Sequence, residues 1–144
     1  MMTGMVKVEL EDIAVSGDEN QFLALLRAPN GELLPIHIDA MQAISIAAGR
    51  SRERMERPLT HDLFVSLLEM LDAPLTRVEI TDLVEGTFYA YLVLERAGVA
   101  IEVDARPSDA MAIAVRTGAP IYVAAKVLES SALRDFEGSG GAEA

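Results

Sequence analysis

The chain has 144 residues, 23 acidic and 12 basic, and its net charge of −11 disfavours non-specific attraction to phosphate backbones and argues against a tight nucleic-acid binder. It has no cysteine, 51% of its residues are apolar, and no apolar run approaches the ~20 residues that span a bilayer. Lys7, Glu9 and Glu11 stand where a signal peptide needs an apolar segment. We therefore expect a cytoplasmic domain with no disulfide, no thiolate-held metal and no membrane contact.

The first fifty residues predict three strands and a helix. Apolar and charged residues alternate over residues 6–13, which is typical of a half-buried strand. Two more strands are expected at residues 22–27 and 33–38. Asp39 is placed to cap a helix that runs through Ala48 and is closed by Gly49.

A second helix is expected from a cap at Thr60 to Leu71, ended by Pro74. The rest of the chain predicts four strands, at residues 76–83, 87–95, 99–103 and 121–123. A short helix is expected at residues 126–133 and a disordered tail at 137–144. Residues 1–136 are then one domain, since this length is typical of a single core.

Another helix follows the third of these strands and combines a polar start with an apolar body. Pro107 pushes Arg106 toward an extended conformation, and Ser108 is suited to accept a hydrogen bond from a first-turn N–H. Asp109 sits where the helix dipole favours negative charge. Gly118 supplies a left-handed end, so the sequence predicts a buried helix with concentrated chemistry at its start.

The order of elements contains a repeat. Val8-Glu9-Leu10-Glu11-Asp12-Ile13 recurs as Val78-Glu79-Ile80-Thr81-Asp82-Leu83. Three further matches follow in the same order, pairing residues 22–26 with 88–92, 36–39 with 101–104 and 39–41 with 109–111. Self-similarity of this kind is a fold-level signal. We predict an α+β fold in which duplicated β3α units form one curved or barrel-like mixed sheet packed with helices.

The second copy differs from the first at the strand-to-helix junction. The first copy passes from Ile38 to its helix through Asp39 alone, whereas the second places Ala-Arg-Pro-Ser between Asp104 and Asp109. This insertion is the strongest local functional signal in the sequence.

Five ordered segments resemble the bifunctional nuclease domain family over about residues 5–130. They are Arg57-Pro58-Leu59-Thr60-His61-Asp62-Leu63, Val78-Glu79-Ile80-Thr81-Asp82-Leu83, Gly86-Thr87-Phe88-Tyr89-Ala90, Asp104-Ala105-Arg106-Pro107-Ser108-Asp109-Ala110 and Pro120-Ile121-Tyr122-Val123. The resemblance implies hydrolysis of phosphodiester bonds in DNA and RNA. It supplies no catalytic residue set.

The candidate catalytic residues come from the insertion and from the start of the preceding helix. Phosphodiester hydrolysis typically needs an activated water and stabilisation of charge on the phosphate, which Asp104, Arg106 and Asp109 can provide. We expect Asp104 and Asp109 to hold a divalent metal, Mg²⁺ or Mn²⁺. His61 and Asp62 join this site if their helix end faces the same cleft.

Each of these residues also has a purely structural interpretation. Asp109 then serves only the helix dipole, Ser108 only caps, and Arg106 pairs with Asp104 to fix the turn. His61 is then a surface residue of a helix start. His37 is a weaker ligand candidate, because no second histidine lies at a metal-binding spacing from it.

Four arginines form the one local positive cluster and are candidates to bind substrate phosphates. They are Arg50, Arg52, Arg54 and Arg57. Two glutamates lie among them, so a solvated loop is the alternative interpretation.

The leading hypothesis is therefore a metal-dependent nuclease that binds nucleic acid transiently as substrate. The rival is a non-enzymatic protein-interaction or regulatory module, suggested by the apolar content and the lack of a complete catalytic constellation. We expect a homo-oligomer in either case. A small-ligand binding domain is a third possibility without a positive signature.

Overall fold

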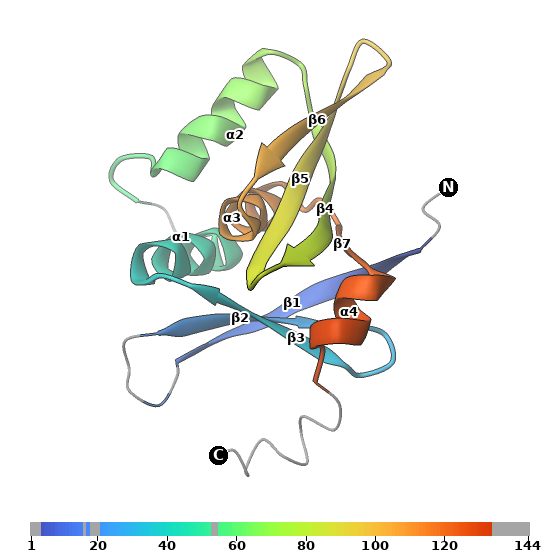
Figure 1. Ribbon diagram of the computed structural model, residues 1–144. Helices are drawn as coiled ribbons and strands as arrows, with labels where there is room; N and C mark the ends of the chain where they lie inside the picture. The colour runs from blue at the N-terminus through green and yellow to red at the C-terminus, as the bar shows by residue number, and fades with distance from the viewer. Residues whose placement is uncertain (1–3, 16, 18–20, 53–54, 134–144) are drawn as a thin grey trace.

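The computed structural model describes residues 4–15, 17, 21–52 and 55–133 (Figure 1). Its elements, in chain order, are β1 (Met5–Val15), β2 (Phe22–Arg27), β3 (Leu33–Ile38), α1 (Ala40–Ser51), α2 (Thr60–Met70), β4 (Leu75–Val84), β5 (Thr87–Arg96), β6 (Val99–Ala105), α3 (Pro107–Thr117), β7 (Ile121–Ala124) and α4 (Ala125–Ser131). The predicted domain boundary at residue 136 and the predicted tail at 137–144 lie outside the described residues and stay predictions.

The strands form one seven-stranded mixed sheet in the order β3-β2-β1-β7-β4-β5-β6. All neighbours are antiparallel except β4 and β7, which are parallel. The sheet is open, with β3 and β6 at its edges. This confirms the predicted α+β class and the curved sheet packed with helices, in its open rather than its barrel form.

The two halves of the sheet are related by the predicted repeat. Val8 of β1 and Val78 of β4 lie opposite the same residue of β7, Ile121, one on each side. The register of β1 shifts between Leu10 and Asp12, and that of β4 shifts between Ile80 and Asp82, which are the matching positions of the repeat. Each half then continues through two antiparallel strands into a helix, as predicted.

One part of the predicted repeat alignment is wrong. Leu26 lies opposite Leu10, and Ala90 lies opposite Ile80, so Leu26 and Ala90 are equivalent in the structure. The sequence match instead pairs Leu26 with Leu92. A shift of two residues leaves every side chain on the same face of a strand, so the apolar pattern alone did not reveal it.

The helices α1 and α3 lie side by side in the angle between the two halves of the sheet, with α2 beside them on the outside (Figure 1). Helix α3 is the most buried of them, because it has no wide polar face. Its buried residues are Pro107, Ser108, Ala110, Met111, Ala112, Ile113 and Ala114. The core around it is aliphatic, as the composition predicts.

The predicted helix ends are partly correct. Asp39 caps α1 by accepting a hydrogen bond from Gln42 N at 2.9 Å, and Gly118 ends α3 in a left-handed conformation with φ of 81°. Helix α2 begins one residue earlier than predicted, after Leu59, and the caps predicted at Thr60 and Ser108 are wrong. Pro107 takes the first position of α3, where its missing N–H costs nothing, so Arg106 becomes the N-cap.

Gly49 lies inside α1 rather than closing it, since the helix continues to Ser51 and ends at Arg52. A Cβ at Gly49 would lie 2.7 Å from Arg116 Nη1 and 2.8 Å from Val115 Cγ2 on α3. The glycine therefore permits the close approach of the two helices. Within the described residues, no helix is long and apolar enough to cross a membrane.

Replacing this glycine tests the close approach. We expect Gly49→Ala to lower the free energy of unfolding by about 1–3 kcal/mol, because a methyl group there overpacks the contact with α3. Urea unfolding measures the change. The matched control is Gly17→Ala, where a Cβ meets nothing within 4 Å, and it should change the free energy of unfolding by less than about 0.5 kcal/mol. A Gly49→Ala protein as stable as wild type would contradict the account.

Candidate functional site

Side chains from α1, α2 and α3 meet in one hydrogen-bonded group, which we call the helix cluster. Its members are Ser45, His61, Asp62, Arg106, Asp109 and Arg116. The residues His61 and Asp62 lie in the first turn of α2, and Asp109 lies in the first turn of α3. The helix packing described above therefore brings together groups that are distant in the sequence.

The exposed end of the helix cluster is a chain of three side chains. His61 Nε2 lies 2.8 Å from Asp109 Oδ1, and Arg106 donates from Nε to Asp109 Oδ2 at 2.9 Å. The exposed fraction of the side chain rises along this chain, from 15% for His61 through 33% for Asp109 to 67% for Arg106. Both Asp109 oxygens are thus used, and Arg106 faces solvent.

The buried end of the helix cluster is organised by Arg116. Its guanidinium donates from Nε to Asp62 Oδ1 at 2.7 Å, from Nη2 to Ser45 Oγ at 3.2 Å and from Nη1 to the Ala112 carbonyl oxygen at 2.8 Å. The side chain is only 7% exposed. Arg116 therefore ties α3 to both other helices.

The contacts of Ser45 fix the orientation of His61. Ser45 Oγ accepts from Arg116 and lies 2.7 Å from His61 Nδ1. The hydroxyl proton of Ser45 is then directed to Nδ1, so a neutral His61 ring carries its proton on Nε2 and donates it to Asp109. Both ring nitrogens are held, and His61 acts as a support for the Asp109 carboxylate.

The pKa values of the two acids are shifted by these contacts. Burial raises the pKa of Asp109, but the hydrogen bonds from Arg106 and His61 outweigh it and hold the pKa below its ordinary value of 3.8. The hydrogen bond from Arg116 lowers the pKa of Asp62 below the same ordinary value. Both carboxyl groups are therefore ionised at neutral pH.

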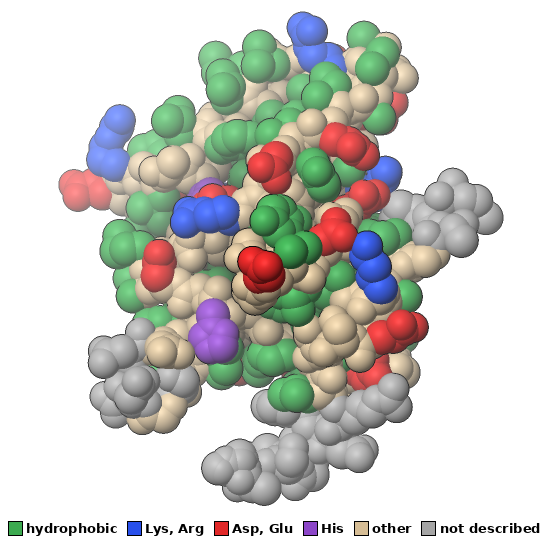
Figure 2. Space-filling view, viewed as in Figure 1, with side chains coloured by type: hydrophobic (Ala, Val, Ile, Leu, Met, Phe, Trp, Pro, Cys, Tyr) green, Lys and Arg blue, Asp and Glu red, His purple; other side chains and the backbone are tan. Residues whose placement is uncertain are grey.

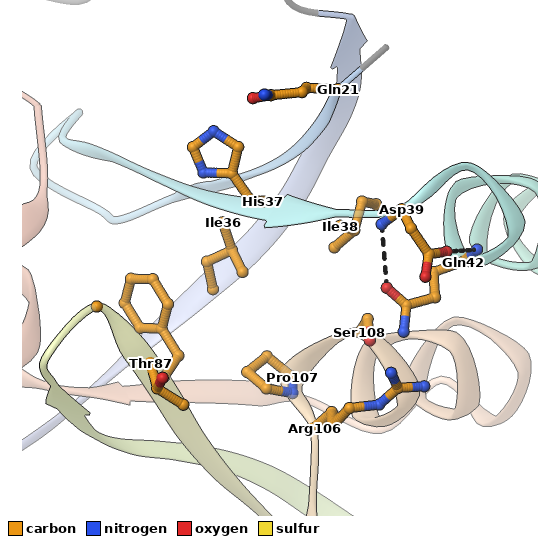
Figure 3. A pocket seen from close by; sticks show the side chains of 12 residues that line it. Gln21, Ile36, His37, Ile38, Asp39, Gln42, Thr87, Arg106, Pro107 and Ser108 are labelled. Atoms are coloured by element: carbon orange, nitrogen blue, oxygen red, sulfur yellow. Dashed lines mark hydrogen bonds between the residues drawn. The ribbon is translucent and has the colours of Figure 1, made fainter.

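An open cavity of about 620 Å³ adjoins the exposed end of the helix cluster (Figure 3). It lies between the end of β3, the first turns of α1 and α3, and the turn from β4 to β5. Arg106 lines it and so belongs both to the cavity and to the helix cluster. His37 also lines this cavity, on the wall formed by β3.

Comparison with known proteins identifies the family. A family model described as the bifunctional nuclease domain matches residues 24–135. The chain belongs to the bifunctional nuclease domain family. Every member of the helix cluster lies within the matched residues.

Bacterial and plant proteins are similar to this chain over most of its length. The chain is 45% identical over 130 residues to an uncharacterized protein of Mycobacterium tuberculosis, covering 90% of this chain and 77% of that protein. It is 31% identical over 110 residues to Bifunctional nuclease 1 of Arabidopsis thaliana, covering 74% of this chain and 34% of that protein. Bifunctional nuclease 2 of the same plant is 29% identical over 107 residues, covering 72% and 32%. The match therefore spans about a third of these plant proteins.

The structure places the predicted site residues in three locations. His61, Arg106 and Asp109 lie together, and Asp62 joins them through Arg116 and Ser45. Asp104 lies on β6 with an exposed side chain, opposite Tyr91 of β5. No hydrogen bond or ion pair joins Asp104 to another side chain in the described part of the chain, and Arg106 pairs with Asp109 instead.

The predicted metal requires several donor side chains close together. Across residues 4–15, 17, 21–52 and 55–133, no group of three or more histidine or acidic side chains is placed to hold a metal ion. Asp109 is held by His61 and Arg106, and no hydrogen bond or ion pair joins Asp104 to another side chain in the described part of the chain. The described residues therefore do not form a site in which three or more side chains hold a metal ion.

The described members of the predicted arginine cluster make no hydrogen bond or ion pair with the helix cluster, although Arg52 lines a cavity together with Asp62 and Arg116. Arg50 donates to the Glu11 carbonyl oxygen at 3.1 Å and lies 4.0 Å from Asp12 Oδ1, both on β1. Arg52 ends α1 in a left-handed conformation, and Arg57 is exposed. Arg54 lies outside the described residues. On the face shown in Figure 2, basic side chains are scattered singly among acidic and hydrophobic ones.

Sequence reasoning missed two members of the helix cluster, Ser45 and Arg116. Each carries a signal that is visible in hindsight. Ser45 is a polar residue in the middle of the apolar run from Ala43 to Ala48, and Arg116, in the last turn of α3, is the one charged residue of that helix after its first turn. Polar groups that interrupt a buried helix face need partners, because burial without a hydrogen bond is costly.

The lowered pKa of Asp62 predicts how stability depends on pH. A carboxyl whose pKa is lower in the folded state than in the unfolded state contributes stability above the unfolded value, near 3.8, and this contribution is lost as pH falls through the folded value. We expect Asp62→Asn to lose less stability than wild type between about pH 5 and the acid limit of folding. Urea unfolding at a series of pH values measures both slopes. Identical slopes in the two proteins would contradict the prediction.

Proposed function

We propose that this chain hydrolyses phosphodiester bonds in nucleic acid, with Arg106 and Asp109 facing the scissile phosphate. Membership of the bifunctional nuclease domain family supports the reaction class. The observation that carries the choice of residues is the chain of contacts His61–Asp109–Arg106, which ends in an exposed guanidinium beside a cavity of about 620 Å³.

Arg106 is suited to bind the phosphate. Only its Nε is used by Asp109, and its two terminal nitrogens have no hydrogen-bond partner in the described part of the chain. A guanidinium presents paired donors that match phosphate oxygens, and it offsets the charge that develops on them in the transition state. The contact with Asp109 holds the group in place before the substrate arrives.

Asp109 is suited to orient the attacking water. Its ionised carboxylate is one-third exposed and is held from two sides by His61 and Arg106. The water oxygen forms the new bond to phosphorus, its proton leaves by way of the carboxylate, and the departing sugar oxygen takes a proton from solvent. Because the pKa of Asp109 is lowered, the carboxylate is a weak base and contributes mainly orientation.

Ser45 is not the nucleophile in this proposal, although Ser45, His61 and Asp109 follow the order of a hydrolase triad. Ser45 and the side chain of Arg116 are each only 7% exposed. A polynucleotide cannot reach an oxygen so deeply enclosed between helices. We assign Ser45 and His61 to positioning Asp109.

The activity assay follows cleavage of labelled single-stranded DNA and RNA. Asp109→Asn keeps the shape of the side chain but removes its charge, and we expect the cleavage rate to fall by about 10²-fold or more. Arg106→Gln removes the guanidinium and should cost about 10²–10³-fold. Circular dichroism and urea unfolding confirm that each variant is folded.

The control in this assay is Asp104→Asn, because Asp104 is exposed and lies outside the helix cluster. We expect it to keep wild-type activity. The predicted need for Mg²⁺ or Mn²⁺ is tested by titrating each cation after chelation, since Mg²⁺ often needs only one or two carboxylates with waters and substrate phosphates. Equal loss in Asp104→Asn and Asp109→Asn would favour a metal shared by both carboxylates and overturn the proposal that Asp109 acts without Asp104.

A second function, a protein-interaction module, is favoured by the outer face of α2. This face leaves large apolar side chains in water, namely Leu63, Leu67, Met70 and Leu71. Met70 is 82% exposed and Leu63 is 65% exposed. Adjacent apolar side chains of this kind commonly mark interaction surfaces. The predicted homo-oligomer would use this face.

Light scattering during size-exclusion chromatography tests the oligomer. We expect the wild-type protein to elute as a multiple of its 15.5 kDa chain mass, and Leu63→Glu to reduce that mass because it places a charge in the apolar face. Val84→Glu, at an exposed position of β4, is the matched control and should leave the mass unchanged. A wild-type monomer would remove the oligomer from consideration.

A further inference from the structure

The cavity beside the helix cluster has two chemically different sides. One side carries Arg106, Pro107 and Ser108 at the start of α3, and the other carries residues 36–39 and Gln42 at the end of β3 and the start of α1 (Figure 3). Its volume of about 620 Å³ lies within the range of small-molecule sites, roughly 300–1,000 Å³. The two sides match different parts of one ligand.

The α3 side offers unused donors. Helix α3 has no side-chain cap, and its first internal hydrogen bond runs from Ala110 N to Arg106 O, which leaves the N–H groups of Ser108 and Asp109 without helical partners. Helix α1 differs, because Asp39 caps its first turn. A free first turn of this kind favours a bound anion.

Ser108 gives independent support for a ligand at this point. The residue is 5% exposed, and its hydroxyl has no hydrogen-bond partner in the described part of the chain. Its side chain lines the cavity. Among the described residues, the enclosed side-chain atom without a partner is Thr81 Oγ1, so the Ser108 hydroxyl is not sealed off but opens onto the cavity, where it is free to hydrogen-bond an oxygen of a bound molecule.

Arg106 adds charge to the same side. Its terminal nitrogens have no hydrogen-bond partner in the described part of the chain, and its side chain is 67% exposed. A guanidinium, a hydroxyl and two backbone N–H groups together match a phosphate group. Two carboxylates lie nearby, but Asp109 already accepts from Arg106 and His61, and Asp39 accepts from Gln42 N.

The opposite side matches a nucleobase. Ile36 and Ile38 make the β3 side apolar, and Phe88, beside the turn from β4 to β5, adds an aromatic ring on which any base can stack. Asp39 Oδ2 and the amide nitrogen of Gln42 have no hydrogen-bond partner in the described residues. An acceptor beside a donor suits the polar edge of a base.

We infer that this cavity binds a phosphorylated nucleoside, with the phosphate at Ser108 and Arg106 and the base against Phe88. The unit is either a free mononucleotide or one nucleotide of a single-stranded polymer, since a base must leave a duplex to enter a cavity. The polymer alternative rests on the proposed function. We commit to the polymer as the source.

Calorimetric titration with AMP tests the site without cleavage, because AMP contains no phosphodiester bond. AMP should bind at least about tenfold more tightly than adenosine or ribose 5-phosphate, each of which fills one side only. Ser108→Ala should weaken AMP and ribose 5-phosphate binding by about tenfold and leave adenosine unchanged. Phe88→Leu should weaken AMP and adenosine by about tenfold and leave ribose 5-phosphate unchanged.

The matched control is Ser66→Ala, an exposed serine of α2 that does not line this cavity, and it should bind AMP as wild type does. Amide resonances of Ser108 and Asp109 in the wild-type protein should shift when AMP is added, which tests the site even if a variant fails to fold. Unshifted amides, or equal affinity for AMP and adenosine, would overturn the inference.

A competition experiment identifies the source of the nucleotide. A short single-stranded oligonucleotide should displace AMP, and a duplex of the same sequence should not. If the oligonucleotide fails to displace AMP, the polymer source is overturned and the cavity is a mononucleotide site. Cleavage activity without AMP binding would overturn this inference but not the proposed function. AMP binding without cleavage would overturn the proposed function but leave the nucleotide site standing.

Discussion

The buried guanidinium of Arg116 is the contact on which the arrangement of the three helices depends. It bonds to α1 through Ser45, to α2 through Asp62 and to its own helix through the Ala112 carbonyl oxygen. A buried charge is tolerated only where such partners surround it, so each partner helix is constrained to one position. Gly49 permits this, because any side chain there would meet the guanidinium. The positions of His61 and Asp109 follow from the same constraint.

The helix cluster changes character along its length. At the Arg116 end the groups are enclosed and their hydrogen bonds join helices, whereas at the Arg106 end they meet solvent and a cavity. A single network therefore serves packing at one end and leaves donors available at the other. Functional groups held by such a supported network keep their geometry before a substrate binds, which lowers the cost of ordering them.

Much of the fold could be predicted from local patterns. The alternation in β1 and β4, the Asp39 cap and the Gly118 end each depend on residues close together in the chain, and the repeat appears when two such local patterns are compared. The N-caps of α2 and α3, Leu59 and Arg106, lie one or two residues before the predicted ones. In α2 the Asp62 carboxylate accepts from Leu59 N, and in α3 Pro107 takes the first position, so neither helix needs a side-chain cap at its N-cap residue.

The site was harder to predict, because its contacts join distant residues. His61 and Asp109 were both candidates, but their contact spans 48 positions, and that of Ser45 with Arg116 spans 71. No local pattern encodes which helix faces will meet. Asp104 and Asp109 are close in sequence, but Asp104 lies on the strand β6 and Asp109 on the helix α3. The predicted pair of Arg106 with Asp104 relied on this closeness, whereas Arg106 pairs with Asp109.

The position of β7 has a consequence for the order in which the molecule assembles. This strand is the only bridge between the two halves of the sheet among the described residues, yet it follows both of them in the chain. During synthesis, the edges of β1 and β4 that pair with β7 therefore stay unpaired until residues Ile121–Ala124 have left the ribosome. Closing so long a segment is slow, and open strand edges invite contacts with other chains. The rate at which β7 pairs with β1 and β4 should therefore determine how much of the newly made protein folds rather than aggregates.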